Sequence, residues 1–295
     1  MRFSFSTKGW HGHTFEEFCD IASQMNFSGI ELHNINNSLF ADKDGAFYNY
    51  AAASTIRRLY EKKLSIPCID AICNPSELTE KEACIKEIRK CMEIASNLHI
   101  PNIRLRANDA ENEDEAVANT AAVIAELLPE AESRGVTLLM ETAGLFSKTE
   151  KLRALLDSFA SDYFASLWNF SAAYFGGGET PEQIIKNLGA YVRHVHINDA
   201  KRVGNAIEYC LLGEGEMPIK DMMLALRSVN YDGFLSLVWD PAWCRELDDM
   251  EIIFSQFVGY MSQFSDPSRN EKTLYYNRAH TGKYVWKKDL LIDAT

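Results

Sequence analysis

Two segments of the sequence hold ionisable side chains at the ends of apolar runs. The run LLM at 138–140 ends in Glu141, a carboxylate that can bind a cation, act as an acid or base, or pair with a buried cationic side chain. A second segment reads HVHIN, and the period of two of a β-strand puts His194, His196 and Asn198 on one face. Two histidines at this spacing are candidate metal ligands, although either can equally be a core residue with satisfied hydrogen bonds.

Two further segments contain charged pairs at the same period. Glu31 and His33 alternate in GIELH, and Arg104 and Arg106 alternate in NIRLR. Glu31 and His33, and also His194, are candidate substrate-binding residues. Either arginine could neutralise Glu31 or Glu141, or bind a substrate phosphate, because a guanidinium pairs well with both kinds of anion.

These segments belong to a regular succession of elements. Apolar runs typical of buried strands alternate with stretches of helical periodicity, and eight such runs begin near Arg2, Gly29, Ser65, Asn102, Val136, Phe164, Val192 and Phe234. Eight βα units favour an α/β fold of the (β/α)8 type, a TIM barrel, over an open sheet. We predict one barrel domain over residues 1–264 and an irregular C-terminal tail over 265–295. In such a barrel the chemistry lies at the carboxyl ends of the strands.

Composition excludes several classes of protein. The chain has 295 residues and a formal net charge of −12, which disfavours nucleic acid and anionic membranes as partners. Its seven cysteines include no C-x-x-C pair, so we expect no disulfide framework, no zinc ribbon and a reducing, cytoplasmic location. Neither an apolar signal core nor a membrane-spanning apolar stretch is visible. A small-molecule ligand is expected, and a homo-oligomer remains open.

The strand segments resemble the xylose isomerase-like TIM-barrel superfamily of sugar and sugar-phosphate isomerases and epimerases. The resemblance covers roughly residues 1–265 and rests on motifs in a fixed order: GIEL at 29–32, Glu141, HVHIND at 194–199, LGEGE at 212–216 and YDGFLSL at 231–237. It implies a carbohydrate or polyol as the small-molecule partner.

The resemblance also implies a divalent metal, Mn, Zn or Mg, held by Glu, Asp, His and Glu on strands 5 to 8. That metal polarises a carbonyl while carboxylates move a proton through an enediolate. Glu141, which is then also the catalytic candidate, and His196 match two of the four positions. Asn169 and Val238 stand where the family has Asp and Glu. We therefore expect weak or absent metal, with Asn169 as a poor ligand and Asp240 as a displaced ligand or a loop cap.

Three other features extend the resemblance. Arg202 has the spacing of an arginine that touches substrate in epimerase relatives, although it could be a solvated loop charge. Trp239 could stack on a sugar or pack in the core. The segment from Lys272 to Asp289 resembles the linker by which some barrels join an adenylate-forming acyl-CoA synthetase domain. We expect residues 265–295 either to pack on the barrel or to lead into such an attached domain.

Three functions compete on these grounds. The first is an active, metal-dependent sugar or polyol isomerase, epimerase or dehydratase. The second is a barrel that has lost catalysis and binds a polyhydroxylated ligand or regulates an attached domain. The third, an apurinic endonuclease, needs a histidine-rich multi-zinc site, and seven histidines with this net charge argue against it. The sequence favours an isomerase-like protein with a depleted metal site and impaired or altered chemistry.

Overall fold

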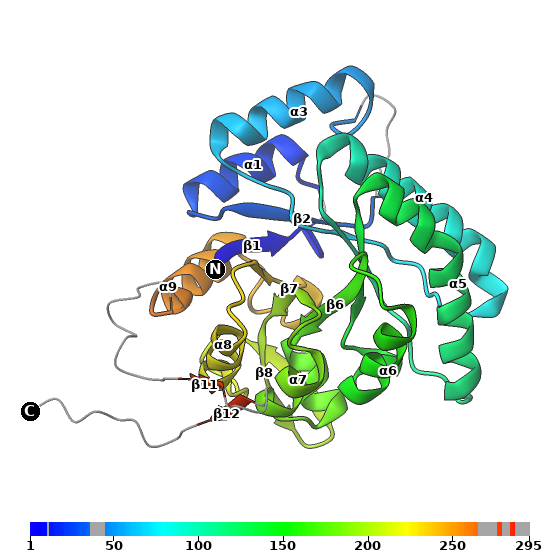
Figure 1. Cartoon of the computed structure of the whole chain (residues 1–295). Helices are drawn as coiled ribbons and strands as arrows, with labels where there is room; N and C mark the ends of the chain where they lie inside the picture. Colours follow the sequence, from blue (N-terminus) through cyan, green and yellow to red (C-terminus); the bar gives the residue numbers. More distant parts are fainter. Residues whose placement is uncertain (11, 36–44, 265–275, 279–283, 287–295) are drawn as a thin grey trace, which may run out of the picture.

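Eight parallel strands close into a barrel in the order β1-β10-β7-β6-β5-β4-β3-β2, which confirms the predicted TIM barrel (Figure 1). The structure is a computed structural model that describes residues 1–10, 12–35, 45–264, 276–278 and 284–286. The barrel strands are β1 (Arg2–Ser6), β2 (Gly29–His33), β3 (Ile69–Asp70), β4 (Asn102–Leu105), β5 (Thr137–Glu141), β6 (Phe164–Asn169), β7 (Val192–Ile197) and β10 (Phe234–Leu237). All the predicted strands are present, and the one predicted at Ser65 is displaced.

That displaced strand, β3, begins at Ile69, four residues after the predicted start. Pro67 explains the difference, because it has no N–H to donate to a neighbouring strand. Only an isolated bridge between Ser65 and Gly29 precedes β3. The carbonyl of Pro67 instead accepts a hydrogen bond of 2.9 Å from the Asn102 side chain.

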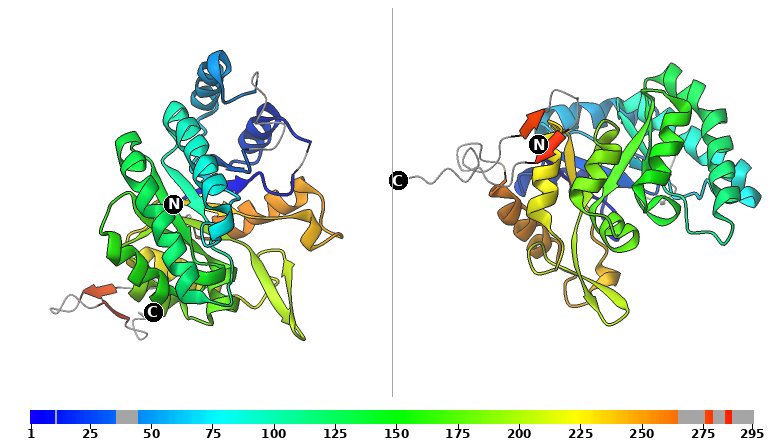
Figure 2. Two further views of the ribbon diagram at one scale, coloured as in Figure 1. Left: turned by 90° about the vertical axis from the view of Figure 1, so that its right-hand side faces the viewer. Right: turned by 60° about the horizontal axis from the view of Figure 1, so that its bottom comes forward.

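Helices cover the outside of the barrel, as the sequence periodicity predicts (Figures 1 and 2). Thr14 and Glu17 form a capping box at the start of α1, and Thr180 caps α7 in the same way with Gln183. The helices are α1 (Phe15–Gln24), α3 (Asn49–Lys62), α4 (Lys81–Leu98), α5 (Glu113–Arg134), α6 (Thr149–Phe159), α7 (Pro181–Leu188), α8 (Ile219–Ser228) and α9 (Met250–Ser262). Among the described residues, no helix has the length and apolar character needed to cross a bilayer.

The main apolar core lies between the barrel and its helices. Phe5 of β1, for example, contacts Phe18 of α1 and Phe254 of α9, with ring centroids 6.0 and 4.4 Å away. Because side chains alternate along a strand, the neighbours Ser4 and Ser6 face the barrel interior. A separate apolar cluster contains only Leu139, Ala165 and Leu167. Much of the remaining buried interior is therefore polar, which is unusual for a barrel of this kind.

A hairpin and a tight loop follow β7 at the carboxyl end of the barrel. The hairpin consists of β8 (Asp199–Val203) and β9 (Ala206–Cys210), and Figure 2 shows it projecting from the body. The Asp199 carboxylate accepts backbone hydrogen bonds from Gly213 and Gly215, at 2.9 and 3.1 Å, and also from Ala200 and Met217. The motif LGEGE thus has a structural role, because it wraps around a buried carboxylate.

Gly215→Ala should destabilise this loop. A Cβ at position 215 would lie 2.0 Å from Asp199 Oδ1 and 2.5 Å from the Ala200 carbonyl. We expect a loss of about 1–3 kcal/mol in the free energy of unfolding, typical of overpacking, measured by urea denaturation. Gly259→Ala is the control, because a Cβ there meets nothing within 4 Å. Equal stability of the two variants would contradict this account of the loop.

After the barrel in the chain, the structure describes one antiparallel pair of short strands, β11 (Tyr276–Arg278) and β12 (Tyr284–Trp286). The rest of the predicted tail, 265–275, 279–283 and 287–295, lies outside the described residues. The resemblance of this tail to a linker before an acyl-CoA synthetase domain stays a prediction.

Candidate functional site

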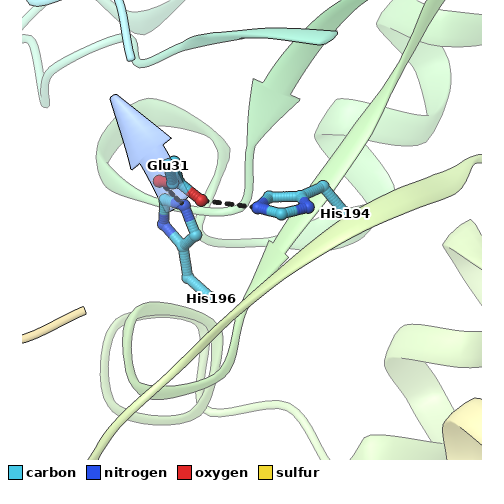
Figure 3. A group of neighbouring side chains, drawn as sticks. All are labelled: Glu31, His194 and His196. Atoms are coloured by element: carbon cyan, nitrogen blue, oxygen red, sulfur yellow. Dashed lines mark hydrogen bonds and ion pairs between the residues drawn. The ribbon is translucent and has the colours of Figure 1, made fainter. Parts of the chain in front are cut away.

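The barrel interior contains a carboxylate between two imidazoles. Glu31 of β2 reaches across to β7, where its Oε2 lies 2.6 Å from His194 Nε2 and its Oε1 lies 2.7 Å from His196 Nε2 (Figure 3). All three side chains are at most 2% exposed. Since β2 and β7 are not neighbours in the barrel, this contact spans its interior.

His196 also joins Glu31 to the second buried carboxylate, Glu141, at the end of β5. Its Nδ1 lies 3.2 Å from Glu141 Oε1, which also accepts a hydrogen bond of 2.7 Å from the Asn169 amide nitrogen. Glu141 Oε2 accepts from Arg104 of β4, at 3.0 Å from Nε and 2.5 Å from Nη2. Both Glu141 oxygens therefore have partners.

Electrostatics keep Glu31, Glu141 and His196 ionised in spite of their burial. Burial alone would raise the pKa of Glu31, but His196 and His194 hold it well below its usual range. Burial likewise opposes ionisation of Glu141, yet the charge of Arg104 and the hydrogen bond from His196 keep its pKa well below normal. For His196, burial lowers the pKa, but the charge of Glu31 and the hydrogen bonds to both carboxylates raise it to about 10.

Two further groups lie at the edge of this network. His33 Nδ1 lies 3.2 Å from Asp70 Oδ2, and the Asp70 Oδ1 atom is buried without a hydrogen-bond partner. Lys8, just after β1, has its Nζ 4.5 Å from the centre of the Trp243 ring, which stacks on Tyr209 of the hairpin at 4.1 Å. Burial and the nearby charge of Arg104 lower the pKa of Lys8.

Six predicted residues lie in the network or at its edge. Glu31, Glu141, His194 and His196 are in direct contact with one another in a chain, and His33 lies beside them at Asp70. Asn169 also joins this group, because its amide nitrogen donates to Glu141. Its amide oxygen accepts from Ser171 Oγ and the Ala172 N–H, both at 3.1 Å.

The remaining predicted residues have other surroundings. Asp240 Oδ1 accepts from the Ala242 N–H at 3.0 Å and caps the short helix Pro241–Trp243, which is the loop role that the sequence allowed. Arg106 is exposed beyond the end of β4. Arg202 is exposed on β8, with its guanidinium 5.7 Å from the Phe175 ring. Trp239 is 2% exposed and donates to the Leu247 carbonyl at 3.2 Å, so it packs in the core.

The sequence analysis did not consider two residues near the network, Asp70 and Lys8. Asp70 is the last residue of β3, and a polar residue at the end of a strand is a signal for a site residue. The prediction missed this signal because it started β3 four residues too early. Arg104 was weighed together with Arg106, and the structure brings only Arg104 to Glu141. Lys8 follows β1 without any distinguishing pattern in the sequence.

Two sets of side chains are candidates for binding a divalent metal. In the family-type set, Val238 offers no ligand atom, Asn169 turns its amide nitrogen toward Glu141, and Arg104 already neutralises that carboxylate. These residues fit a metal poorly. Glu31, His194 and His196 have ligand atoms within 4.8 Å of one another, and two histidines with one Glu form a known zinc donor set. Their hydrogen bonds to one another already satisfy these atoms.

The fold and the position of the network define a class: a TIM barrel with ionisable groups in its interior, of which Glu141 and His196 lie at or near the carboxyl ends of their strands. Residues 19–251 match the model of the Xylose isomerase-like TIM barrel family. The chain belongs to this family, which confirms the resemblance. No curated protein sequence matches the chain significantly.

Solved structures share this fold at low sequence identity. The crystal structure of an IOLI protein with a binding zinc atom has a TM-score of 0.75 at 16% identity, with 90% of this chain and 99% of that chain covered. The probable 3-DHS dehydratase AsbF from Bacillus anthracis has a TM-score of 0.70 at 18% identity, with 90% and 100% covered. The 3-keto-D-glucoside 4-epimerase YcjR from E. coli has a TM-score of 0.70 at 13% identity, with 89% and 99% covered.

Proposed function

We propose that this chain is a sugar or polyol isomerase or epimerase that acts on a small polyhydroxylated molecule at the carboxyl end of its barrel. The observation that supports this most is the ionised chain Glu31–His196–Glu141 inside the barrel, flanked by Arg104. The structural relatives named as a 3-keto-D-glucoside 4-epimerase and a probable 3-DHS dehydratase support the substrate class.

In this proposal Glu141 and Arg104 face the reacting carbons together. A carboxylate can take a proton from the carbon next to a carbonyl, and a guanidinium can hold the enediolate oxygen that forms. Arg104 suits this role because one of its nitrogens, Nη1, has only a long contact of 3.5 Å, to the Ala71 carbonyl. A divalent metal, where bound, would supply the same carbonyl polarisation through Glu31, His194 and His196.

A specific observation favours a second candidate, a barrel that binds a polyhydroxylated ligand without turnover. Both Glu141 oxygens already accept hydrogen bonds, and Arg104 neutralises the carboxylate, so its basicity is low. In that case the ligand would occupy the same end of the barrel with no proton transfer.

Proton exchange in D₂O separates the two candidates. The protein is incubated with a panel of ketoses, aldoses and cyclic keto-polyols, with and without Mn²⁺, and loss of the C–H signal next to the carbonyl is followed by NMR. We expect exchange that falls by at least about 100-fold in Glu141→Gln and is unchanged in the exposed control Arg106→Ala. Saturable binding without exchange would support the second candidate. The absence of both binding and exchange would reject both candidates.

We expect the unmodified protein to hold little metal after dialysis. Val238→Glu combined with Asn169→Asp should raise the affinity for Mn²⁺ by about tenfold or more, because it restores two carboxylate ligands. Isothermal titration calorimetry on the two proteins measures this, with Asp240→Asn as a control without effect. Tight stoichiometric metal in the unmodified protein, lost in His194→Gln, would instead place the metal at Glu31, His194 and His196.

A further inference from the structure

We propose that Cys73 and Cys84 are a site of reversible covalent modification, at which an intramolecular disulfide joins the loop after β3 to helix α4. The two sulfur atoms lie 2.7 Å apart. This is closer than unbonded sulfur atoms ordinarily approach, and a disulfide bond of about 2.05 Å needs an inward movement of only roughly 0.7 Å. Among the residues that the structure describes, no other pair of cysteine sulfurs is in such contact.

The surrounding hydrogen bonds keep the two sulfurs in place. Glu87 of α4 accepts backbone hydrogen bonds from Ile72 and Cys73, at 2.6 and 3.3 Å, so the loop is docked on the helix with its thiol toward Cys84. The Cys73 thiol also lies 3.7 Å from the Cys84 carbonyl oxygen. The two thiols therefore already face each other between the loop and the helix, which is the arrangement that a disulfide requires.

The exposure of the two residues assigns their roles in the reaction. Cys73 is half-buried and Cys84 is fully buried, so an oxidant meets Cys73 first. The hydrogen bond to Cys84 and burial raise the pKa of Cys73, so the oxidation is carried out at alkaline pH. With glutathione disulfide as the oxidant, the Cys73 thiolate attacks one sulfur and releases one glutathione thiol. Cys84 then attacks the mixed disulfide and releases the second. Two protein thiols lose two hydrogens, and one glutathione disulfide becomes two glutathione molecules.

A disulfide bond between Cys73 and Cys84 would restrain the chain at the edge of the ionisable network. The loop begins directly after Asp70, which contacts His33, and Ala71, whose carbonyl faces Arg104. Asn74 in the same loop accepts a hydrogen bond of 3.1 Å from the Asn108 N–H, which follows β4. A link from Cys73 to α4 would therefore fix the segment that borders Asp70 and Arg104. The inference does not depend on the proposed isomerase activity.

The experiment uses the full chain and glutathione disulfide, followed by alkylation of free thiols and peptide mapping without reductant. Trypsin releases Cys84 within residues 82–86 and Cys73 within 64–81 together with Cys68, so fragmentation of the linked peptides must place the bond at Cys73. We expect one disulfide, five alkylated cysteines of the seven, and reversal by dithiothreitol.

Thermal unfolding gives an independent reading. Closing this short loop should raise the melting temperature of the oxidised protein by about 5 °C. The rise should be absent in Cys73→Ser and Cys84→Ala, and retained in Cys244→Ser, whose half-buried cysteine lies elsewhere. Cys73→Ser is the safer variant for folding because its side chain is only half-buried. Seven alkylated cysteines after oxidation, a bond at Cys68, or an equal rise in Cys73→Ser would overturn the proposal.

Discussion

Arg104→Ala should lower the free energy of unfolding by roughly 3–5 kcal/mol, because it leaves the buried Glu141 carboxylate without its cationic partner. The side chains of the pair are 11% and 1% exposed, so Glu141 has little bulk water around it to compensate for the lost guanidinium. Urea denaturation near pH 7 measures the loss. The matched control is Arg106→Ala, two residues along the same strand face but exposed, with an expected change within about 0.5 kcal/mol.

A second variant separates the charge from the packing. If the cost arises from an unpaired buried charge, Arg104→Met combined with Glu141→Gln should recover most of the lost stability. Equal losses in Arg104→Ala and in this double variant would show that the ion pair is not the cause. A loss below about 1 kcal/mol in Arg104→Ala would show that water reaches Glu141.

The free energy of unfolding should fall on both sides of a plateau in pH. The pKa of His196 is raised from 6.5 to about 10, so its contribution is complete below pH 6.5 and is lost as the pH rises through about 10. The pKa of Glu141 lies well below 4.5, so its contribution is present above that pH and is lost as the pH falls. Denaturation curves between pH 3 and pH 10.5 test both sides.

The fall in the free energy of unfolding at alkaline pH can be assigned to His196. Wild type and His196→Gln should differ by on the order of 2 kcal/mol or more at pH 6.5, and the difference should shrink as the pH approaches 10. A difference that stays constant over this range would mean that His196 is neutral in the folded protein at every pH tested.

The sequence patterns predicted most of the barrel strands and the central residues of the ionisable network. Strand starts followed from apolar runs, and the period of two placed Glu31, His194 and His196 on inward faces. No local sequence pattern predicts the contact of Glu31 with two histidines 163 and 165 residues later in the chain, because that contact depends on closure of the barrel.

Arg104 and Arg106 illustrate a second limit of periodicity. Both share one strand face, but β4 ends at Leu105, so Arg104 is enclosed by the barrel and Arg106 lies outside it. A period gives the direction of a side chain and not its depth. Trp239 shows the same limit, since its partner, the Leu247 carbonyl, comes from a loop whose path the sequence does not indicate.

The stacking of Trp243 gives this protein an optical reporter. Its indole stacks on the Tyr209 ring of the projecting hairpin and lies 4.5 Å from the Lys8 ammonium, and it is half-exposed, whereas Trp10, Trp168 and Trp239 are buried. Indole fluorescence depends strongly on a nearby charge and on stacking. A ligand that draws Lys8 away or shifts the hairpin will change the emission of this one tryptophan, so binding can be followed without a label.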